Sequence, residues 1–244
     1  MPVASPEEYF DVMSRERPGV RAGNLRFGLE RLFEGVQLGG ARVLDIGAGA
    51  GHVSLYAAAM GAAEVVGLEP EGAGSGDEVT DSFRRLASLL RAEDVRIEPV
   101  TLQDYDQAEA RFDVLLLLAS INHLDEDACI RLHRDREARA RYLALLRKLA
   151  TLASDGARLV VSDCSRHNLF PRVGVRNPIA STIEWHKHQS PRLWAELLGE
   201  AGFRDARIRW DSPNTLRTPG RVLLGNRIGA YMLTSVFTLT MTKA

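Results

Sequence analysis

Histidine and carboxylate side chains lie close together in the segment TIEWHKHQSP, which covers residues 182–191. His186 and His188 are two residues apart, so both rings would project from the same side of an extended chain, as would the carboxylate of Glu184. Groups of these types bind divalent metal ions or transfer protons. Because the sequence has no CxxC or HExxH spacing, we expect no metal site. The pair is a candidate for acid–base catalysis or for binding a polar molecule, and Trp185 could contact the same molecule.

Two other polar clusters follow apolar runs that are typical of buried strands. Asn122 and His123 follow the run Phe112–Ala119, and Asp163 follows the run Arg158–Ser162. In an open α/β sheet, ligands bind beyond the carboxyl ends of the strands. We therefore expect these three side chains to share one end of the sheet with the histidine pair.

The segment VLDIGAGAGH, residues 43–52, places three glycines between a predicted strand and a predicted helix. A ligand can approach such a turn closely because glycine has no side chain, and the helix N-terminus offers unpaired N–H donors. Asp45 stands two residues before the first glycine, and Glu69 ends the next predicted strand in VVGLEP. An acid in the position of Glu69 can accept hydrogen bonds from both hydroxyls of a ribose.

A dinucleotide site is the competing interpretation of this turn. Its fingerprint is GxGxxG, but counting from Gly47 places His52 where the third glycine belongs. The carboxylate of Asp45 would also repel a diphosphate, whereas it would attract a cationic group. These residues favour a nucleoside with a positively charged substituent over a dinucleotide.

Short apolar runs alternate with longer helical patterns along the chain, which is typical of a doubly wound α/β sheet. Seven runs are predicted to be strands: Arg42–Ile46, Val65–Leu68, Val95–Val100, Phe112–Ala119, Arg158–Ser162, Ala206–Trp210 and Tyr231–Thr242. The sheet would be mainly parallel with an antiparallel last strand, and a long loop would join the last two strands. We predict one domain over residues 1–244, with a helical cover at residues 1–37 and an insertion at residues 165–190.

Capping residues and breaks indicate where the helices lie. A charged helical pattern from Asp125 to Ala153 is expected to break near His133. Ser190 is placed to cap a helix over residues 191–200, with a proline in its first turn and Gly202 just past its end. The segment PEGAGSGDEV, which follows Glu69, is either a flap over a ligand or a surface loop.

The motifs VLDIGAGAG, VVGLEP, LQDY and FDVLLLLASINHL, in this order, resemble those of the class I S-adenosylmethionine-dependent methyltransferases. The resemblance covers about residues 38–203, and the last two predicted strands fit the reversed final hairpin of that family. It implies a Rossmann-like fold and S-adenosyl-L-methionine as the cofactor. It says little about the acceptor of the methyl group.

The resemblance also implies which residues contact the cofactor. The glycine turn and its acid would hold the methionine part, Glu69 the ribose, and the segment after the third strand the adenine. The full set is Asp45, Gly47, Ala48, Gly49, Glu69, Pro70, Leu102, Gln103, Ala119 and Ser120. Many relatives have an acid directly after the third strand, where this chain has Thr101, so Asp104 is not included.

Methyl transfer is an in-line displacement that depends on holding the acceptor atom against the methyl carbon. A hydroxyl acceptor also needs a base, and a positioned histidine contributes about 10²–10⁴-fold to the rate. We predict His123 as this base, with His186 and His188 as secondary catalytic candidates. The predicted substrate-binding residues are Asn122, Asp163, Glu184 and Trp185. Because this set is rich in hydrogen-bonding groups, we expect O-methylation of a small hydroxylated, sugar-like molecule.

Other functions stay open at this stage. A small amine could be the acceptor, since the same carboxylates would hold a cation. The chain could also be a non-catalytic regulatory protein that binds the cofactor. An oxidoreductase with a dinucleotide cofactor is disfavoured by Asp45 and His52.

Composition narrows the setting in which the protein acts. The 244 residues are 45% hydrophobic and 26% charged, with a net charge of −1, which is typical of a globular protein and argues against a general affinity for nucleic acid or membrane. The two cysteines form no disulfide framework, and the start MPVASPEEYFDVM lacks the pattern of a secretory signal. We therefore expect a cytoplasmic protein with a small-molecule acceptor, and the sequence leaves its oligomeric state unknown.

Overall fold

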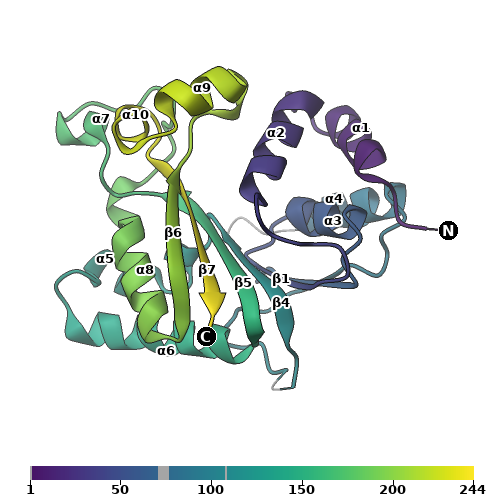
Figure 1. Cartoon of the computed structure of the whole chain (residues 1–244), viewed down its shortest axis with the longest axis horizontal. Coiled ribbons are helices and arrows are strands. Elements are labelled where there is room, and N and C mark those ends of the chain that lie inside the picture. Colours follow the sequence, from purple (N-terminus) through teal and green to yellow (C-terminus); the bar gives the residue numbers. More distant parts are fainter. Residues whose placement is uncertain (1, 71–76, 108) are drawn as a thin grey trace.

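The structure is a computed structural model that describes residues 2–70, 77–107 and 109–244. Within these ranges, the strands form one sheet in the order β3-β2-β1-β4-β5-β7-β6 (Figure 1). Their bounds are β1 Arg42–Ile46, β2 Glu64–Leu68, β3 Arg96–Glu98, β4 Phe112–Leu118, β5 Ala153–Cys164, β6 Phe203–Trp210 and β7 Val236–Lys243. Strand β7 runs antiparallel to both of its neighbours, and the first five strands pair in parallel. The predicted Rossmann-like sheet with a reversed last strand is confirmed.

Helices cover both faces of the sheet and one of its ends (Figure 1). One face is covered by α1 Pro6–Glu16, α2 Ala22–Leu32, α3 His52–Ala59 and α4 Asp77–Leu89, and the other by α5 Glu126–Arg131, α6 Arg136–Thr151 and α8 Pro191–Glu200. Three short helices, α7 Leu169–Arg172, α9 Arg217–Leu224 and α10 Arg227–Met232, lie together beyond the end of the sheet. Single 3-10 turns occur at η1 Ile121–His123, η2 Trp185–Lys187 and η3 Asn214–Leu216.

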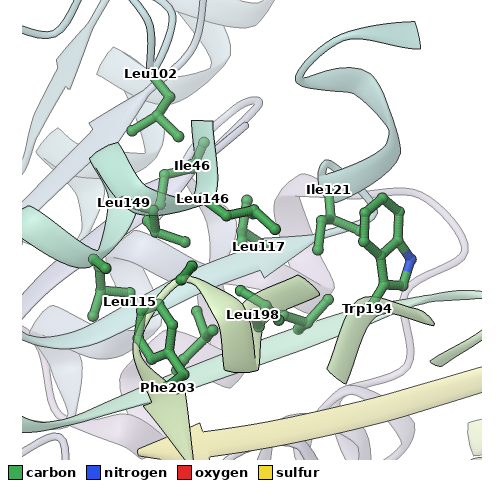
Figure 2. Packing of buried hydrophobic residues seen from close by; sticks show 14 of the residues in the cluster. Ile46, Leu102, Leu115, Leu117, Ile121, Leu146, Leu149, Trp194, Leu198 and Phe203 are labelled. Atoms are coloured by element: carbon green, nitrogen blue, oxygen red, sulfur yellow. The ribbon is translucent and has the colours of Figure 1, made fainter. Parts of the chain in front are cut away.

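The buried side chains form two clusters, one on each face of the sheet. Val43 packs with α1–α4 and Leu44 with α5, α6 and α8, because successive strand residues point to opposite faces. Figure 2 shows part of the second cluster, in which Leu115 and Leu117 of β4 pack among side chains of α6 and α8. Strands buried on both faces have few polar positions, so the polar side chains gather at the strand ends.

Most of the predicted helix ends agree with the structure. The hydroxyl of Ser190 accepts a hydrogen bond from the backbone N–H of Leu193 and caps α8. The charged helical pattern is broken at residues 132–135, where Asp135 caps the start of α6. The starts of α8 and α6 are therefore both set by capping hydrogen bonds from residue types that the sequence shows.

Four elements differ from their predictions, among them β6, which begins at Phe203 rather than Ala206. Strand β5 begins at Ala153 rather than Arg158, because Gly156, with φ +75°, forms a bulge within the strand instead of a turn before it. The long loop before β7 contains α9 and α10, and β7 itself begins at Val236. Strand β3 covers three residues of the predicted six. Of the segment PEGAGSGDEV, residues 71–76 lie outside the described residues.

Candidate functional site

The glycine turn after β1 has a backbone that depends on glycine. Gly47, Gly49 and Gly51 have φ values of +76°, +53° and +67°, a region in which other residues are strained. The N–H groups of Gly47 and Ala48 both donate to the carbonyl of Leu68, so the turn is fixed to the end of β2. Gly51 is the N-cap of α3, and a Cβ at this position would lie 2.6 Å from the ring of Phe83 on α4, so the start of this helix is packed closely against α4.

Two of these glycines differ in what surrounds them. A Cβ at Gly47 would lie 2.5 Å from the Cβ of Ser120, whereas a Cβ at Gly49 would have no atom within 4 Å. We expect Gly47→Ala to lower the free energy of unfolding by about 1–3 kcal/mol more than Gly49→Ala, because only the first adds a clash to the backbone strain. Chemical denaturation of both variants measures this difference. Equal losses would contradict the close contact between Gly47 and Ser120.

Asp45, next to the carboxyl end of β1, is a buried carboxylate with one hydrogen-bond partner on the neighbouring helix. It is 2% exposed, and its Oδ2 accepts a hydrogen bond of 2.8 Å from the hydroxyl of Ser54 on α3. Burial raises the pKa of Asp45 to about 6, and the hydrogen bond from Ser54 opposes this shift. The group therefore carries a charge at neutral pH in a place where water does not solvate it.

Glu69 lies beside the turn at the end of β2. Its Oε2 accepts a hydrogen bond of 2.8 Å from the N–H of Gly49. A cavity of about 200 Å³ opens between Gly49 and Glu69 on one side and the first turns of α4 on the other. Its other lining residues are Val79, Thr80, Phe83, Arg84, Ile97 and Pro99, and none of these was predicted from the sequence. Gly49 of the glycine turn and Glu69 thus meet at one small cavity.

The predicted adenine contacts after β3 lie elsewhere. Leu102 is 1% exposed and packs in the core cluster, and Gln103 is exposed with its amide bonded to the carbonyl of Leu124. Thr101 and Asp104 bond to each other through their side chains. Pro70 is exposed at the end of the described part of this segment. The residues of this region that line the small cavity are Ile97, in the middle of β3, and Pro99, directly after it.

The end of β4 adjoins the glycine turn. Ala119 has a φ of +55°, which is uncommon for a residue with a side chain and is often found at functional sites. The hydroxyl of Ser120 donates to the carbonyl of Ile46, and its Cβ faces Gly47. Ala119 in turn lines a second, larger cavity, so this cavity and the glycine turn are neighbours.

This second cavity, which we call the acceptor cavity, has a volume of about 450 Å³. It collects predicted side chains from three separate segments: Asn122, His123, Asp163, Glu184 and His188. The sequence did not predict its apolar wall, which consists of Leu32, Leu118, Ile183 and Val236, or the ammonium group of Lys187. Leu32 comes from α2, so the N-terminal cover takes part in the cavity.

His188 and Asp163 form a hydrogen-bonded pair in the wall of the acceptor cavity. The Nδ1 of His188 lies 3.0 Å from Oδ1 of Asp163, whose side chain is 1% exposed and also accepts from the N–H of Cys164. This pairing places the proton on Nδ1 and leaves the lone pair of Nε2 available, and Nε2 has no partner among the described residues. In this arrangement Nε2 can accept a hydrogen bond or a proton from a molecule in the cavity.

Two oxygen atoms at this cavity are buried without a hydrogen-bond partner in the described part of the chain. They are Oδ1 of Asn122 and Oδ2 of Asp163. A buried acceptor that is left unpaired costs about 1–3 kcal/mol, so such atoms point to a donor that arrives with a ligand.

His123 has a different environment from His188. Its side chain is 54% exposed, its Nδ1 lies 2.5 Å from Oε1 of Glu126, and its Nε2 accepts from the amide of Asn122 at 3.3 Å. The hydrogen bond with His123 lowers the pKa of Glu126. Lys187 bonds to both Glu126 and Glu184, so these groups form an ionic rim around the cavity opening.

The segment that carries the histidine pair is not extended, so its two rings do not share a side. Residues Trp185–Lys187 form the 3-10 turn η2, in which residues two apart point in different directions. His186 is exposed, and neither His186 nor Trp185 lines the acceptor cavity. His188 is held in place because Gln189 donates to the carbonyl of Cys129 on α5.

The described residues contain neither a candidate metal site nor a candidate membrane-spanning helix. Among them, no group of three or more histidine, cysteine, aspartate or glutamate side chains is placed to hold a metal ion. No described helix is long and apolar enough to span a bilayer. The expectation that the protein uses no metal stays a prediction.

Comparison with known proteins identifies the kind of domain. The model of a protein family described as a methyltransferase domain matches residues 20–207. No curated protein matches the sequence significantly.

Solved structures resemble the whole fold. A SAM-dependent methyltransferase from Aquifex aeolicus has a TM-score of 0.62 and 16% identity, over 98% of this chain and 99% of that one. Others come from Mesorhizobium loti, with a TM-score of 0.59 and 16% identity over 88% and 98%, and from Archaeoglobus fulgidus, with 0.59 and 16% over 96% and 99%. At these identities the likeness concerns the fold.

Proposed function

Because the chain belongs to the class I S-adenosylmethionine-dependent methyltransferases, we propose that it methylates an oxygen atom of a small molecule bound in the acceptor cavity. The cofactor of this family is S-adenosylmethionine. The observation that carries the proposal is the His188–Asp163 pair beside two buried, unpaired oxygen atoms. The oxygens call for a ligand with hydrogen-bond donors, and the pair offers a base for one of them.

We propose that the cofactor lies across the glycine turn. Glu69 would accept the ribose hydroxyls, and Asp45 would attract the positive charge of the methionine part. The backbone of residues 47–49 would lie against the cofactor. The sulfonium would then lie near Ala119, at the border between the glycine turn and the acceptor cavity.

The histidine base in this proposal is His188 rather than His123. The Nε2 of His188 is available, and Asp163 both fixes the ring and stabilises the charge that it gains. Both nitrogens of His123 already have partners, and its ring is largely exposed at the rim. His186 does not line the acceptor cavity, so we do not propose a catalytic role for it. The roles of Asn122 and Asp163 would be to accept hydrogen bonds from the substrate.

The shape of the cavity limits the acceptor. One wall is polar and the other consists of Leu32, Leu118, Ile183 and Val236. A volume of about 450 Å³ is within the range of about 300–1,000 Å³ typical of small-molecule sites. We therefore propose a hydroxylated metabolite with one apolar face, whereas the sequence led us to expect a sugar-like molecule.

The experiment that tests this function uses S-adenosylmethionine with a deuterated methyl group and a fractionated metabolite extract. Mass spectrometry finds the product that gains the labelled methyl group, and NMR of that product identifies the methylated atom. We expect an O-methyl product. An N-methyl product would overturn the choice of oxygen. Tight binding of S-adenosylhomocysteine with no product from any extract would favour a non-catalytic regulatory protein.

A further inference from the structure

A third cavity, of about 860 Å³, lies apart from the site described above. It is open to solvent and is lined by the segment after β5, the start of α8, the end of β6 and α10. None of its lining residues lines the acceptor cavity. Its basic lining residues are Arg166, His167, Arg172, Arg192 and Arg227. We call this third cavity the arginine cavity.

The arginine cavity has an unbalanced positive charge. Among the residues that the structure describes, no aspartate or glutamate lines it. The side chains of Arg172, Arg192 and Arg227 form no hydrogen bond or ion pair within the described part of the chain. Burial lowers the pKa of His167, and the positive charges of Arg166, Arg227 and Arg172 lower it further, so these groups lie within electrostatic range of one another.

The charge is concentrated in two segments that meet at this end of the molecule (Figure 1). Residues 165–181 and 212–235 carry six arginines and no acid, although the whole chain has a net charge of −1. Arg221, one of these six, lies 3.5 Å from Glu34, and arginines elsewhere are paired in the same way, as Arg139 is with Glu196 and Glu200. Three of the six line the arginine cavity: Arg166, Arg172 and Arg227. Several like charges around one concave surface repel one another unless an anion lies between them.

Aromatic and aliphatic side chains form the rest of the wall. Trp210 and Tyr231 are half-buried, and Ile208 and Ile228 are 37% and 72% exposed. Apolar surface of this kind stabilises a ligand through its flat or hydrophobic part, while guanidinium groups bind phosphate through paired hydrogen bonds. A ligand that satisfies both features has an anionic group on an apolar body.

We propose that the arginine cavity binds a small phosphate-bearing molecule with an aromatic or other apolar body. The anion would lie among Arg172, Arg192 and Arg227, and the body against Trp210 and Tyr231. Arg166 already bonds to His133 and to Gln189, so it would remain in the wall. The site does not overlap the acceptor cavity, and the proposal does not depend on the methyl-transfer reaction.

The test is calorimetric titration of the full chain, saturated with S-adenosylhomocysteine, with 1-naphthyl phosphate, inorganic phosphate and 1-naphthol. We expect 1-naphthyl phosphate to bind more tightly than either fragment. The double variant Arg172→Gln/Arg227→Gln should weaken this binding by about tenfold or more, because two charge-assisted contacts are lost. Both side chains are exposed and unpaired in the described structure, so circular dichroism and the melting temperature should not change.

The matched control is Arg147→Gln, which removes the same charge from an exposed position on α6. This variant should bind 1-naphthyl phosphate as the unmodified chain does. The proposal would be overturned if the double variant bound 1-naphthyl phosphate as tightly as the unmodified chain. It would also be overturned if Arg147→Gln lost as much affinity as the double variant, because the ligand would then be attracted by net charge alone. Equal affinity for inorganic phosphate would show that the aromatic wall contributes nothing and would also overturn it.

Discussion

Replacing His188 by alanine is expected to lower the turnover number by about 10²–10⁴-fold, while the dissociation constant of S-adenosylhomocysteine changes little. The reason is that His188 lines the acceptor cavity with the lone pair of its Nε2 available, whereas it does not line the small cavity at the glycine turn. Asp163→Asn should also lower turnover, because an amide at this position no longer stabilises the charge on the imidazolium ring. Steady-state kinetics with the identified acceptor measures both changes.

His123→Ala is the matched control for this prediction, because it removes the same kind of side chain from the rim of the same cavity. We expect a much smaller loss of turnover, together with a change in KM through the ionic rim at Glu126 and Lys187. If His123→Ala lost more turnover than His188→Ala, the base would be assigned to the wrong histidine. If neither variant lost turnover, the acceptor would need no base, as for an amine that is already deprotonated.

The positions of the glycine turn and Glu69 were largely predictable because both follow strands that are recognisable in the sequence. Asp45 lies in β1, Gly47 and Gly49 lie in the turn that follows it, and Glu69 directly follows the adjacent strand, so a strand–turn–helix pattern determines their positions. The fold followed in the same way, since buried parallel strands have continuous apolar runs. Leu102 was harder to place because a residue after a short strand can face either the ligand or the core, and here it faces the core.

The acceptor side was predictable in its position but not in its detail. Asp163 and Asn122 follow parallel strands, so their convergence is a property of the sheet. The preference for His188 over His123 depends on which hydrogen bonds each ring makes, and such bonds depend on tertiary geometry. The turn η2 also separated His186 from His188, although their spacing suggested an extended pair. Leu32 lines the cavity because α2 folds back over the sheet, an arrangement that has no local signal in the sequence.

Asp45→Asn is expected to change stability and cofactor affinity in opposite directions. Burial raises the pKa of this carboxyl group from its ordinary value of 3.8 to about 6, so the ionised form destabilises the folded protein at neutral pH. A shift of this size corresponds to about 3 kcal/mol. The amide carries no charge and can still accept the hydrogen bond from Ser54. The variant without cofactor should therefore unfold at a higher temperature than the unmodified chain at neutral pH.

The effect of Asp45 on the stability of the folded protein should change with pH. The folded pKa is above the unfolded one, so the unmodified chain gains stability as pH falls from about 6 toward 4, when Asp45 takes up a proton in the folded state. The advantage of Asp45→Asn should thus be largest above pH 6 and disappear near pH 4. Ser54→Ala is the matched control: it keeps the charge, removes its hydrogen bond, and should lower stability at neutral pH.

Cofactor affinity should fall in Asp45→Asn although stability rises. The negative charge that destabilises the protein without cofactor is the same charge that would attract the cationic methionine part. We expect Asp45→Asn to weaken S-adenosylhomocysteine binding by about 10–100-fold, the value of a hydrogen bond to a charged group. Thermal unfolding with and without the ligand, together with calorimetry, measures both effects on one sample. A variant that is more stable but binds the ligand normally would remove Asp45 from the cofactor site. A variant that is less stable than the unmodified chain at neutral pH would show that water or another group solvates the Asp45 carboxylate in the folded chain. The attraction of a cation could then not be explained by an unsolvated charge at Asp45.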